Sequence, residues 1–336
     1  MDVGELFALA IESHILGQCQ ILSIGIRLLG ILLFAFLLWR ADLSAIISSL
    51  SVLPWWLIAY VYIVGFGVIF CRSLRWRRLL LPRKFKIRST FLYYYMGVFL
   101  RAFTPGSIGD FVKVLYLRHH GVSVGESVST CVVDRLWDLA SLIVLGIVGL
   151  LVVSDLGFPI NRWAALGIVL AGILLIVGLI IQRSLLSRAV RFLYHFLVPA
   201  RFKDHVKATA QGFVAQIKRL SKETILVTML WTTLAWLVYF YQMHLLASML
   251  GLPLSLFQVA VIMSFVNFVV LLPWSIAGIG TRDAALIALF ATLGLGWEKA
   301  LAFSILVLST NLFIGLIGCV LWMFYPVKIS IGPSKK

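Results

Sequence analysis

The chain has 336 residues, of which 62% are hydrophobic and only 12% are charged, and its formal net charge is +16. Soluble domains carry about 25% charged residues, so this chain lacks the polar side chains that a water-facing surface needs. A soluble protein is therefore excluded. The apolar residues form long unbroken runs rather than the alternation of a transmembrane barrel, so we predict an all-α integral membrane protein.

Six apolar segments are long enough for full transmembrane helices, which take about 20 residues each. In chain order they are Ile21–Trp39, Val52–Cys71, Leu136–Val153, Trp163–Ile181, Ile225–Leu246 and Ala300–Phe324. Residues 1–20 are expected to form an interfacial segment, residues 21–326 a single transmembrane domain, and residues 327–336 a short basic tail.

Two further apolar regions are interrupted in the middle. Phe91–His120 is broken by the sequence from Thr104 to Asp110, and Leu254–Gly294 by the sequence from Pro273 to Asp283. Proline removes an amide donor and glycine admits conformations that a helix forbids, so both helices should break there. Each arm of the first region has roughly 14 residues, or about 21 Å of helix against a hydrocarbon core of about 30 Å, and cannot cross alone.

The basic residues indicate the topology. Arg72–Arg88 contains eight Lys or Arg and no acid, and Gln182–Lys222, predicted to be a basic amphipathic surface segment, contains nine with Asp204 as its one acid. Basic loops beside apolar spans mark the cytoplasmic side. Both stretches lie on that side only if Phe91–His120 enters the membrane and returns, so this region is predicted to be re-entrant. For the second region, re-entry and two full spans give the same parity and both remain open. No nucleic-acid recognition motif accompanies the charge, so we expect no nucleic-acid partner.

The two broken regions share a layout that suggests an internal repeat. Pro105 and Pro273 lie half the chain length apart, and each is followed by Ser-Ile, by glycine and by a short apolar arm. The arms end at Gly121 and Gly294, before spans that begin with an acid. Opposite orientations would make this an inverted repeat, which many transporters use to form a midplane site between broken helices. The alternative is two unrelated kinks relieved by neighbouring helices.

Helix breaks inside a membrane favour anions, because half-helix N-termini present unpaired amides and partial positive charge. The predicted headgroup-binding residues at the first break are Arg101, Gly106, Ser107, Gly109, Asp110 and Lys113, and those at the second are Gly278, Gly280, Arg282 and Asp283. Both aspartates are equally well explained as helix caps.

The segment Asp134-Arg135-Leu136-Trp137-Asp138 places two carboxylates on one helical face and adds Asp134, Arg135 and Asp138 to the candidates. It is either a gate or headgroup contact facing the first break, or a salt-bridge cluster at the mouth of a span. Metal-ligand spacing, nucleotide loops and hydrolase motifs are absent from the sequence, so we predict no metal, no cofactor and no enzymatic activity.

The two breaks, together with Asp134-Arg135-Leu136 downstream of the first, resemble the flippase-like transmembrane family of lysylphosphatidylglycerol synthetases. In that family, glutamate commonly stands where this chain has Asp110 and Asp283. The resemblance implies lipid translocation without the aminoacyltransferase domain that some members carry, because nothing soluble is expected after Phe324.

We therefore predict a lipid transporter of the cell (inner or plasma) membrane with both termini in the cytoplasm. It would bind an anionic or glycosylated headgroup of a phospholipid, polyprenyl lipid or glycolipid at a midplane site between the broken helices. The alternative is a non-transporting scaffold or partner subunit for a lipid-modifying enzyme or a cell-envelope glycosyltransferase.

Overall fold

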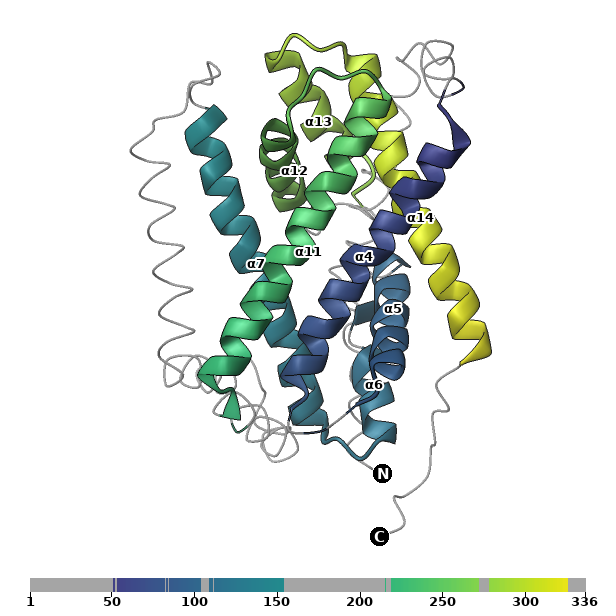
Figure 1. The fold of residues 1–336 in the computed structure, drawn as a ribbon, viewed down its shortest axis with the longest axis vertical. Helices are drawn as coiled ribbons and strands as arrows, with labels where there is room; N and C mark the ends of the chain where they lie inside the picture. The colour runs from purple at the N-terminus through teal and green to yellow at the C-terminus, as the bar shows by residue number, and fades with distance from the viewer. Residues whose placement is uncertain are drawn as a thin grey trace, which may run out of the picture.

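The computed structural model describes residues 51, 53–81, 83, 85–103, 109–110, 112–153, 215, 219–271 and 278–325, with the backbone alone at 101–103, 146–153 and 271. These residues form eight α-helices and contain no strand, which confirms the predicted all-α class (Figure 1). The predicted spans at 21–39 and 163–181, the N-terminal segment, most of the basic segment 182–222 and the C-terminal tail lie outside the described residues.

The first group of helices comprises α4 (Trp55–Leu79), α5 (Ile87–Phe103), α6 (Val112–His119) and α7 (Val124–Val153). Helix α4 begins after Pro54 and extends well past the expected end at Cys71. The sequence from Cys71 to Leu81 contains neither glycine nor proline, and arginine is a good helix former, so the helix continues. Much of the basic stretch Arg72–Arg88 is therefore helix and not loop, which corrects the sequence-based prediction.

The second group comprises α11 (Lys222–Met249), α12 (Leu256–Leu271), α13 (Thr281–Thr292) and α14 (Trp297–Phe324). Ser221 caps α11 by accepting a hydrogen bond from the Thr224 amide at 3.0 Å. Ser255 and Gln258 form a reciprocal capping box at the start of α12, each side chain accepting from the other's amide. Three described helices, α4, α11 and α14, are long and apolar enough to cross a membrane.

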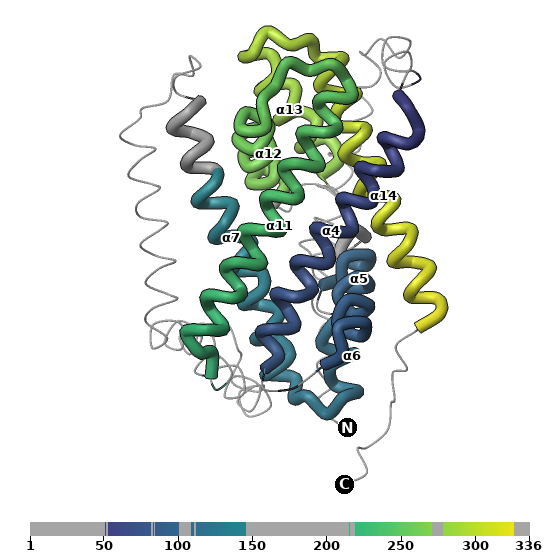
Figure 2. Tube along the Cα trace, in the orientation of Figure 1, coloured from purple at the N-terminus to yellow at the C-terminus, as the bar shows by residue number. Residues whose placement is uncertain are grey.

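The two groups pack as an inverted repeat. Each broken region folds into a hairpin, with α5 against α6 and α12 against α13. Helix α4 packs on α11, and α4, α5, α6 and α7 correspond in order to α11, α12, α13 and α14. Each contact in one half therefore has a counterpart in the other: α5–α14 matches α12–α7, α4–α5 matches α11–α12, and α6–α7 matches α13–α14. In Figures 1 and 2, α5 and α6 occupy the lower half and α12 and α13 the upper half, while α4 and α11 run in opposite directions.

The turns after the hairpins fix the register of this repeat. Gly121 and Gly294 have φ angles of 72° and 67°, which glycine adopts without steric cost. The residue after each glycine donates its amide to the carbonyl five residues earlier, Leu117 in one turn and Phe290 in the other. The interval from Gly121 to Gly294 equals the interval from Asp110 to Asp283. The repeat therefore aligns the two aspartates, whereas alignment of the two prolines would be out of register.

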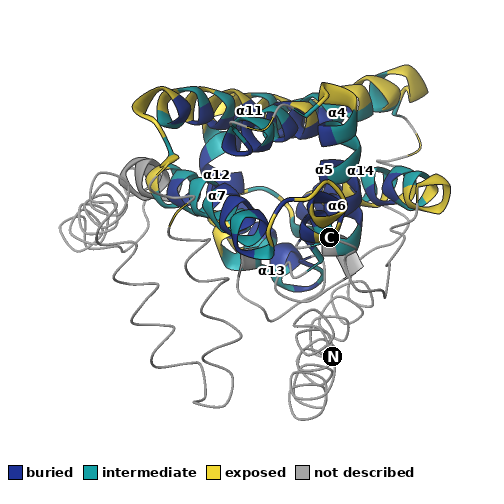
Figure 3. Ribbon diagram, turned by 90° about the horizontal axis from the view of Figure 1, so that it is seen from below, coloured by how far each residue is buried: buried dark blue, intermediate teal, exposed yellow. Residues whose placement is uncertain are grey.

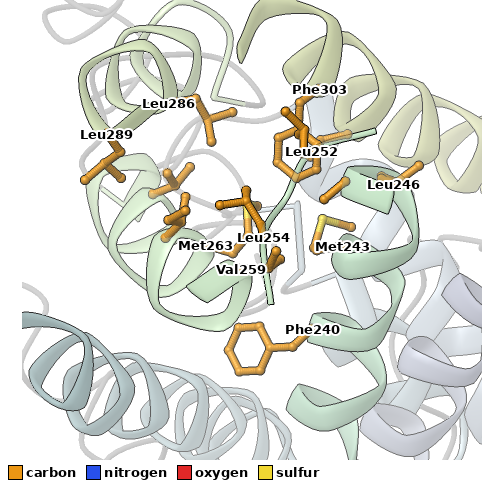
Figure 4. Close-up of a cluster of buried hydrophobic side chains, with 14 of the residues drawn as sticks. Phe240, Met243, Leu246, Leu252, Leu254, Val259, Met263, Leu286, Leu289 and Phe303 are labelled. Atoms are coloured by element: carbon orange, nitrogen blue, oxygen red, sulfur yellow. The ribbon is translucent and has the colours of Figure 1, made fainter. Parts of the chain in front are cut away.

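The two halves have different interiors. A large apolar core lies among α11, α12, α13 and α14, and its buried side chains include Met243, Met263, Leu286 and Phe303 (Figure 4). A smaller apolar core joins α4, α5 and α6 to the side of α14. The outward faces of α4, α11 and α14 are exposed (Figure 3) and carry large apolar side chains, for example Leu226 and Leu316. Such outer faces suit lipid rather than water.

Candidate functional site

The first hairpin is built around a close approach of its two helices. A methyl group at Gly97 of α5 would lie 2.9 Å from Asp110 Oδ1 and 3.1 Å from Lys113 Cγ, so a side chain there would displace these two residues. Asp110 lies in a short 3₁₀ turn immediately before α6, and Lys113 lies in the first turn of α6. Gly106 and Ser107 are outside the described residues. Arg101 lies on α5, where only the backbone is described.

The predicted residues of α6 and α7 meet in one buried charge network. Arg75 of α4 donates through Nε to Asp134 Oδ1 and through Nη1 to Asp138 Oδ1, both at 2.7 Å. Lys113 Nζ lies 3.0 Å from Asp110 Oδ1 and 3.4 Å from Asp134 Oδ2. Arg135 pairs with Asp110 and lies 3.6 Å from Asp138 Oδ2. We call these three cations and three carboxylates the charge network.

Neighbouring aromatic and hydroxyl groups complete the charge network. Lys113 Nζ lies over the rings of Trp76 and Tyr94, 5.2 Å and 4.3 Å from their centroids. The Tyr94 hydroxyl donates to Asp134 Oδ2 at 3.3 Å, and Arg75 also reaches the Thr232 hydroxyl of α11 at 3.4 Å. These contacts join α4, α5, α6, α7 and α11.

The charge network is neutral in sum and largely excluded from solvent. The side chains of Arg75, Asp134 and Lys113 have no exposed surface, and that of Arg135 is 28% exposed. Buried charges are costly unless they are paired and hydrogen-bonded, and here every member has an opposite partner. The network therefore fixes the first hairpin against α4 and α7, and in this state its acids and bases bind one another.

The second hairpin carries a smaller polar group. Gly278 and Gly280 have φ angles of 77° and 82°, which side chains other than glycine rarely adopt. The Gly280 amide donates to Asp283 Oδ2 at 2.6 Å, so Asp283 caps α13. Arg282 donates through Nε to the Ser304 hydroxyl of α14 at 2.9 Å, and Ser304 in turn bonds Asp283.

The structural register shows how the two hairpins differ. Lys113 corresponds to Leu286, and Asp134 corresponds to Val307, both of which are buried apolar residues. Cys131 corresponds to Ser304. The positions of Lys113 and Asp134 therefore hold charges in the first half of the repeat and apolar side chains in the second.

The structure also reveals residues that the sequence analysis did not select. Arg75 was assigned to a cytoplasmic loop, yet it is the centre of the charge network. The absence of helix breakers before Pro82 was the available signal, since it extends the helix through Arg72 and Arg75. Tyr94 was not among the predicted site residues, and its contact with Asp134 depends on the fold of the hairpin.

Together, the spans, the two opposed hairpins and the buried charges define a polytopic helical membrane protein built on an inverted repeat. The chain belongs to the family described as the lysylphosphatidylglycerol synthase TM region, whose profile matches residues 22–318. It is similar to a UPF0104 membrane protein of Methanothermobacter thermautotrophicus, with 23% identity over 278 residues, covering 79% of this chain and 81% of the relative. No solved structure matches.

Proposed function

We propose that the protein moves lipids across the membrane and binds an anionic or glycosylated headgroup between its two hairpins. The opposed arrangement of the hairpins is the observation that carries this proposal. The α5–α6 hairpin approaches the middle of the molecule from one end and α12–α13 from the other (Figure 1). In transporters with inverted repeats, broken helices that meet at the midplane form the substrate site.

In this proposal both hairpins are re-entrant in the cell membrane, and the charge network and both termini lie toward the cytoplasm. The amides of Gly280, Arg282 and Ala284 already have acceptors within this turn, so the guanidinium of Arg282 at the start of α13 is the group that binds the headgroup. Arg282 has a planar guanidinium whose fork of donors can hold two oxygens at once, which a lysine cannot do. The family's name contains that of a lysylated phospholipid, and from this name we propose only that the substrate of this chain is a lipid.

The test is lipid movement by the purified protein in liposomes, measured as exposure of a fluorescently labelled phosphatidylglycerol to a membrane-impermeant quencher. We expect Arg282→Lys to reduce the rate and Arg282→Ala to reduce it further, because headgroup oxygens lose a bidentate partner. Arg88→Ala removes an exposed positive charge from α5 and serves as the matched control.

A comparison with Ser304→Ala separates binding from anchoring. If Arg282 only anchors α13 to α14 through Ser304, then Ser304→Ala should reduce activity as much as Arg282→Ala. Wild-type lipid movement by well-folded Arg282→Ala protein would remove Arg282 from the site. Absence of movement by the wild-type chain would refute the transport proposal.

A membrane scaffold for a lipid-modifying enzyme is the second candidate, and the charge network is compatible with it. Six charges that neutralise one another give the first hairpin a fixed position, which suits a docking framework as well as a transporter. Copurification of a lipid-modifying enzyme or glycosyltransferase, combined with no lipid movement by the chain alone, would support this candidate.

A further inference from the structure

Arg72 and Arg75 lie close together on α4 but have different hydrogen-bond partners. Arg75 lies one helical turn further along α4 and is bound by two carboxylates. Arg72 is half-buried, and its Nε atom is buried without a hydrogen-bond acceptor among the described residues. Arg72 interacts electrostatically with Asp138, but Asp138 is already paired with Arg75 and Arg135. With Arg72 included, four cations are grouped with three carboxylates.

A second buried donor lies directly beside Arg72. The Arg72 guanidinium carbon lies over the Trp236 ring of α11, 5.5 Å from its centroid. Trp236 is 6% exposed, and its indole Nε1 also has no hydrogen-bond acceptor within the described part of the chain. An indole nitrogen can only donate, so an internal acceptor or a ligand must satisfy it. Buried donors without an acceptor are rare in folded proteins, and two on adjacent side chains indicate a ligand.

A third donor continues the series on the same face of α11. Tyr239 lies one helical turn from Trp236, and their rings meet edge to face at 5.5 Å. The Tyr239 oxygen accepts a hydrogen bond from Asn267 Nδ2 of α12 at 2.9 Å, so its own hydrogen is directed elsewhere. Tyr239 interacts electrostatically with both Arg72 and Arg282. The series therefore extends from α4 across α11 toward the second hairpin.

These observations share one chemical requirement. A guanidinium, an indole N–H and a phenol O–H are all donors, and the local charge is positive. A phosphate group supplies several acceptor oxygens and the negative charge that offsets an uncompensated cation in a low-dielectric interior. We infer that Arg72, Trp236 and Tyr239 form a binding site for a phosphate oxyanion between the two halves of the repeat. None of the three residues belongs to the site predicted from the helix breaks.

This site deepens the proposed function and rests on it only for the source of the phosphate, which would be the headgroup of a lipid. Arg282 would then hold the distal part of the headgroup, while Arg72 and Trp236 hold its phosphodiester. The same donors could hold free inorganic phosphate, so the experiment compares both sources.

The test is ligand-induced thermal stabilisation of the full-length protein in detergent. Three probes are titrated: dioctanoyl phosphatidylglycerol, inorganic phosphate, and dioctanoylglycerol, which has the same acyl chains without phosphate. We expect the phosphorylated lipid to raise the melting temperature and dioctanoylglycerol to have little effect. Stabilisation by inorganic phosphate as well would identify a site for the bare anion, whereas stabilisation by the lipid alone would identify a lipid site.

Two variants assign the effect to the site. Arg72→Gln removes the charge, and Trp236→Phe removes the N–H while keeping an aromatic ring. Each should raise the half-stabilising concentration about tenfold, the size expected for one lost charge-assisted or buried hydrogen bond. Arg88→Gln and Trp56→Phe make the same changes at exposed positions and should respond as the wild type does.

A second measurement covers the case in which a variant is unstable or lipid remains bound. Phosphorus is assayed per mole of protein after purification in the same detergent, and Arg72→Gln should retain less than the wild type. Equal phosphorus content and equal titration curves for the wild type and Arg72→Gln would overturn the site. A wild type that binds the lipid but does not move it would refute transport and leave the binding site standing.

Discussion

Replacing Arg75 by methionine tests whether the charge network holds the first hairpin in place. The substitution keeps much of the side-chain volume but removes the cation that bonds Asp134 and Asp138, both at 2.7 Å. Asp134 then keeps Lys113 at 3.4 Å and Tyr94 at 3.3 Å as partners, and the network changes from neutral to a net negative charge. Removing one partner of a buried ion pair costs about 3–5 kcal/mol, because the other charge stays buried without compensation.

The double variant Arg75→Met with Asp134→Leu provides the decisive comparison, because it restores neutrality with Lys113, Arg135, Asp110 and Asp138. We expect it to be more stable than the sum of the single effects by about 0.5–3 kcal/mol, the range for residues in one network. Stability is measured as unfolding of the purified protein in mixed micelles at increasing SDS fraction.

Arg78→Met makes the same substitution further along α4, where the ion pair with Glu223 is solvent-exposed, and should cost only about 0–1 kcal/mol. A loss from Arg75→Met no larger than that from Arg78→Met, or strict additivity in the double variant, would refute the structural role of the network.

Three further predictions test packing, topology and backbone conformation. Gly318→Ala should destabilise the protein by about 1–3 kcal/mol, because its new methyl group would overlap Phe99 of α5. Gly315→Ala on the same helix meets nothing within 4 Å and should not destabilise in the same unfolding assay. Gly280→Leu should abolish lipid movement but not membrane insertion, because leucine rarely adopts a φ of 82°; normal movement would place the site elsewhere. Single cysteines placed at Lys84, Lys207 and Lys335 should all react with an impermeant maleimide from the cytoplasmic side. Reaction of the Lys84 and Lys207 positions from opposite sides would refute re-entry of Phe91–His120.

Several features of the fold were predictable because they depend on local chemistry. Pro105 and Pro273, with their glycines, predicted that two apolar regions would break, and α5–α6 and α12–α13 flank those breaks. The acids Glu126 and Glu298 lie in the first turns of α7 and α14, where the helix dipole favours them. Asp134 and Arg135 form ion pairs with Lys113 and Asp110 of the first hairpin. A role of Asp134, Arg135 and Asp138 as a gate or headgroup contact stays a prediction.

The limits of sequence reasoning are clearest on α4. Counting basic residues assigned Arg72 and Arg75 to the same loop, because charge patterning treats every arginine near the end of an apolar span alike. Their different environments arise from which helix each one faces. Arg75 faces α7, where two carboxylates lie one helical turn apart, and Arg72 faces the Trp236 ring of α11.

The sequence by itself determined the membrane class, the helical composition, the two breaks and their shared layout. These follow from hydropathy, proline and glycine, which act within a few residues along the chain. Only the tertiary structure decided the register of the repeat, the pairing of six charges in one half and the apolar core of the other. Residues such as Lys113 and Leu286 occupy equivalent positions, and their partners come from helices distant in sequence. Whether a buried charge is neutralised or available to a ligand depends on those long-range contacts, because in a low-dielectric interior the nearest opposite charge determines its energy.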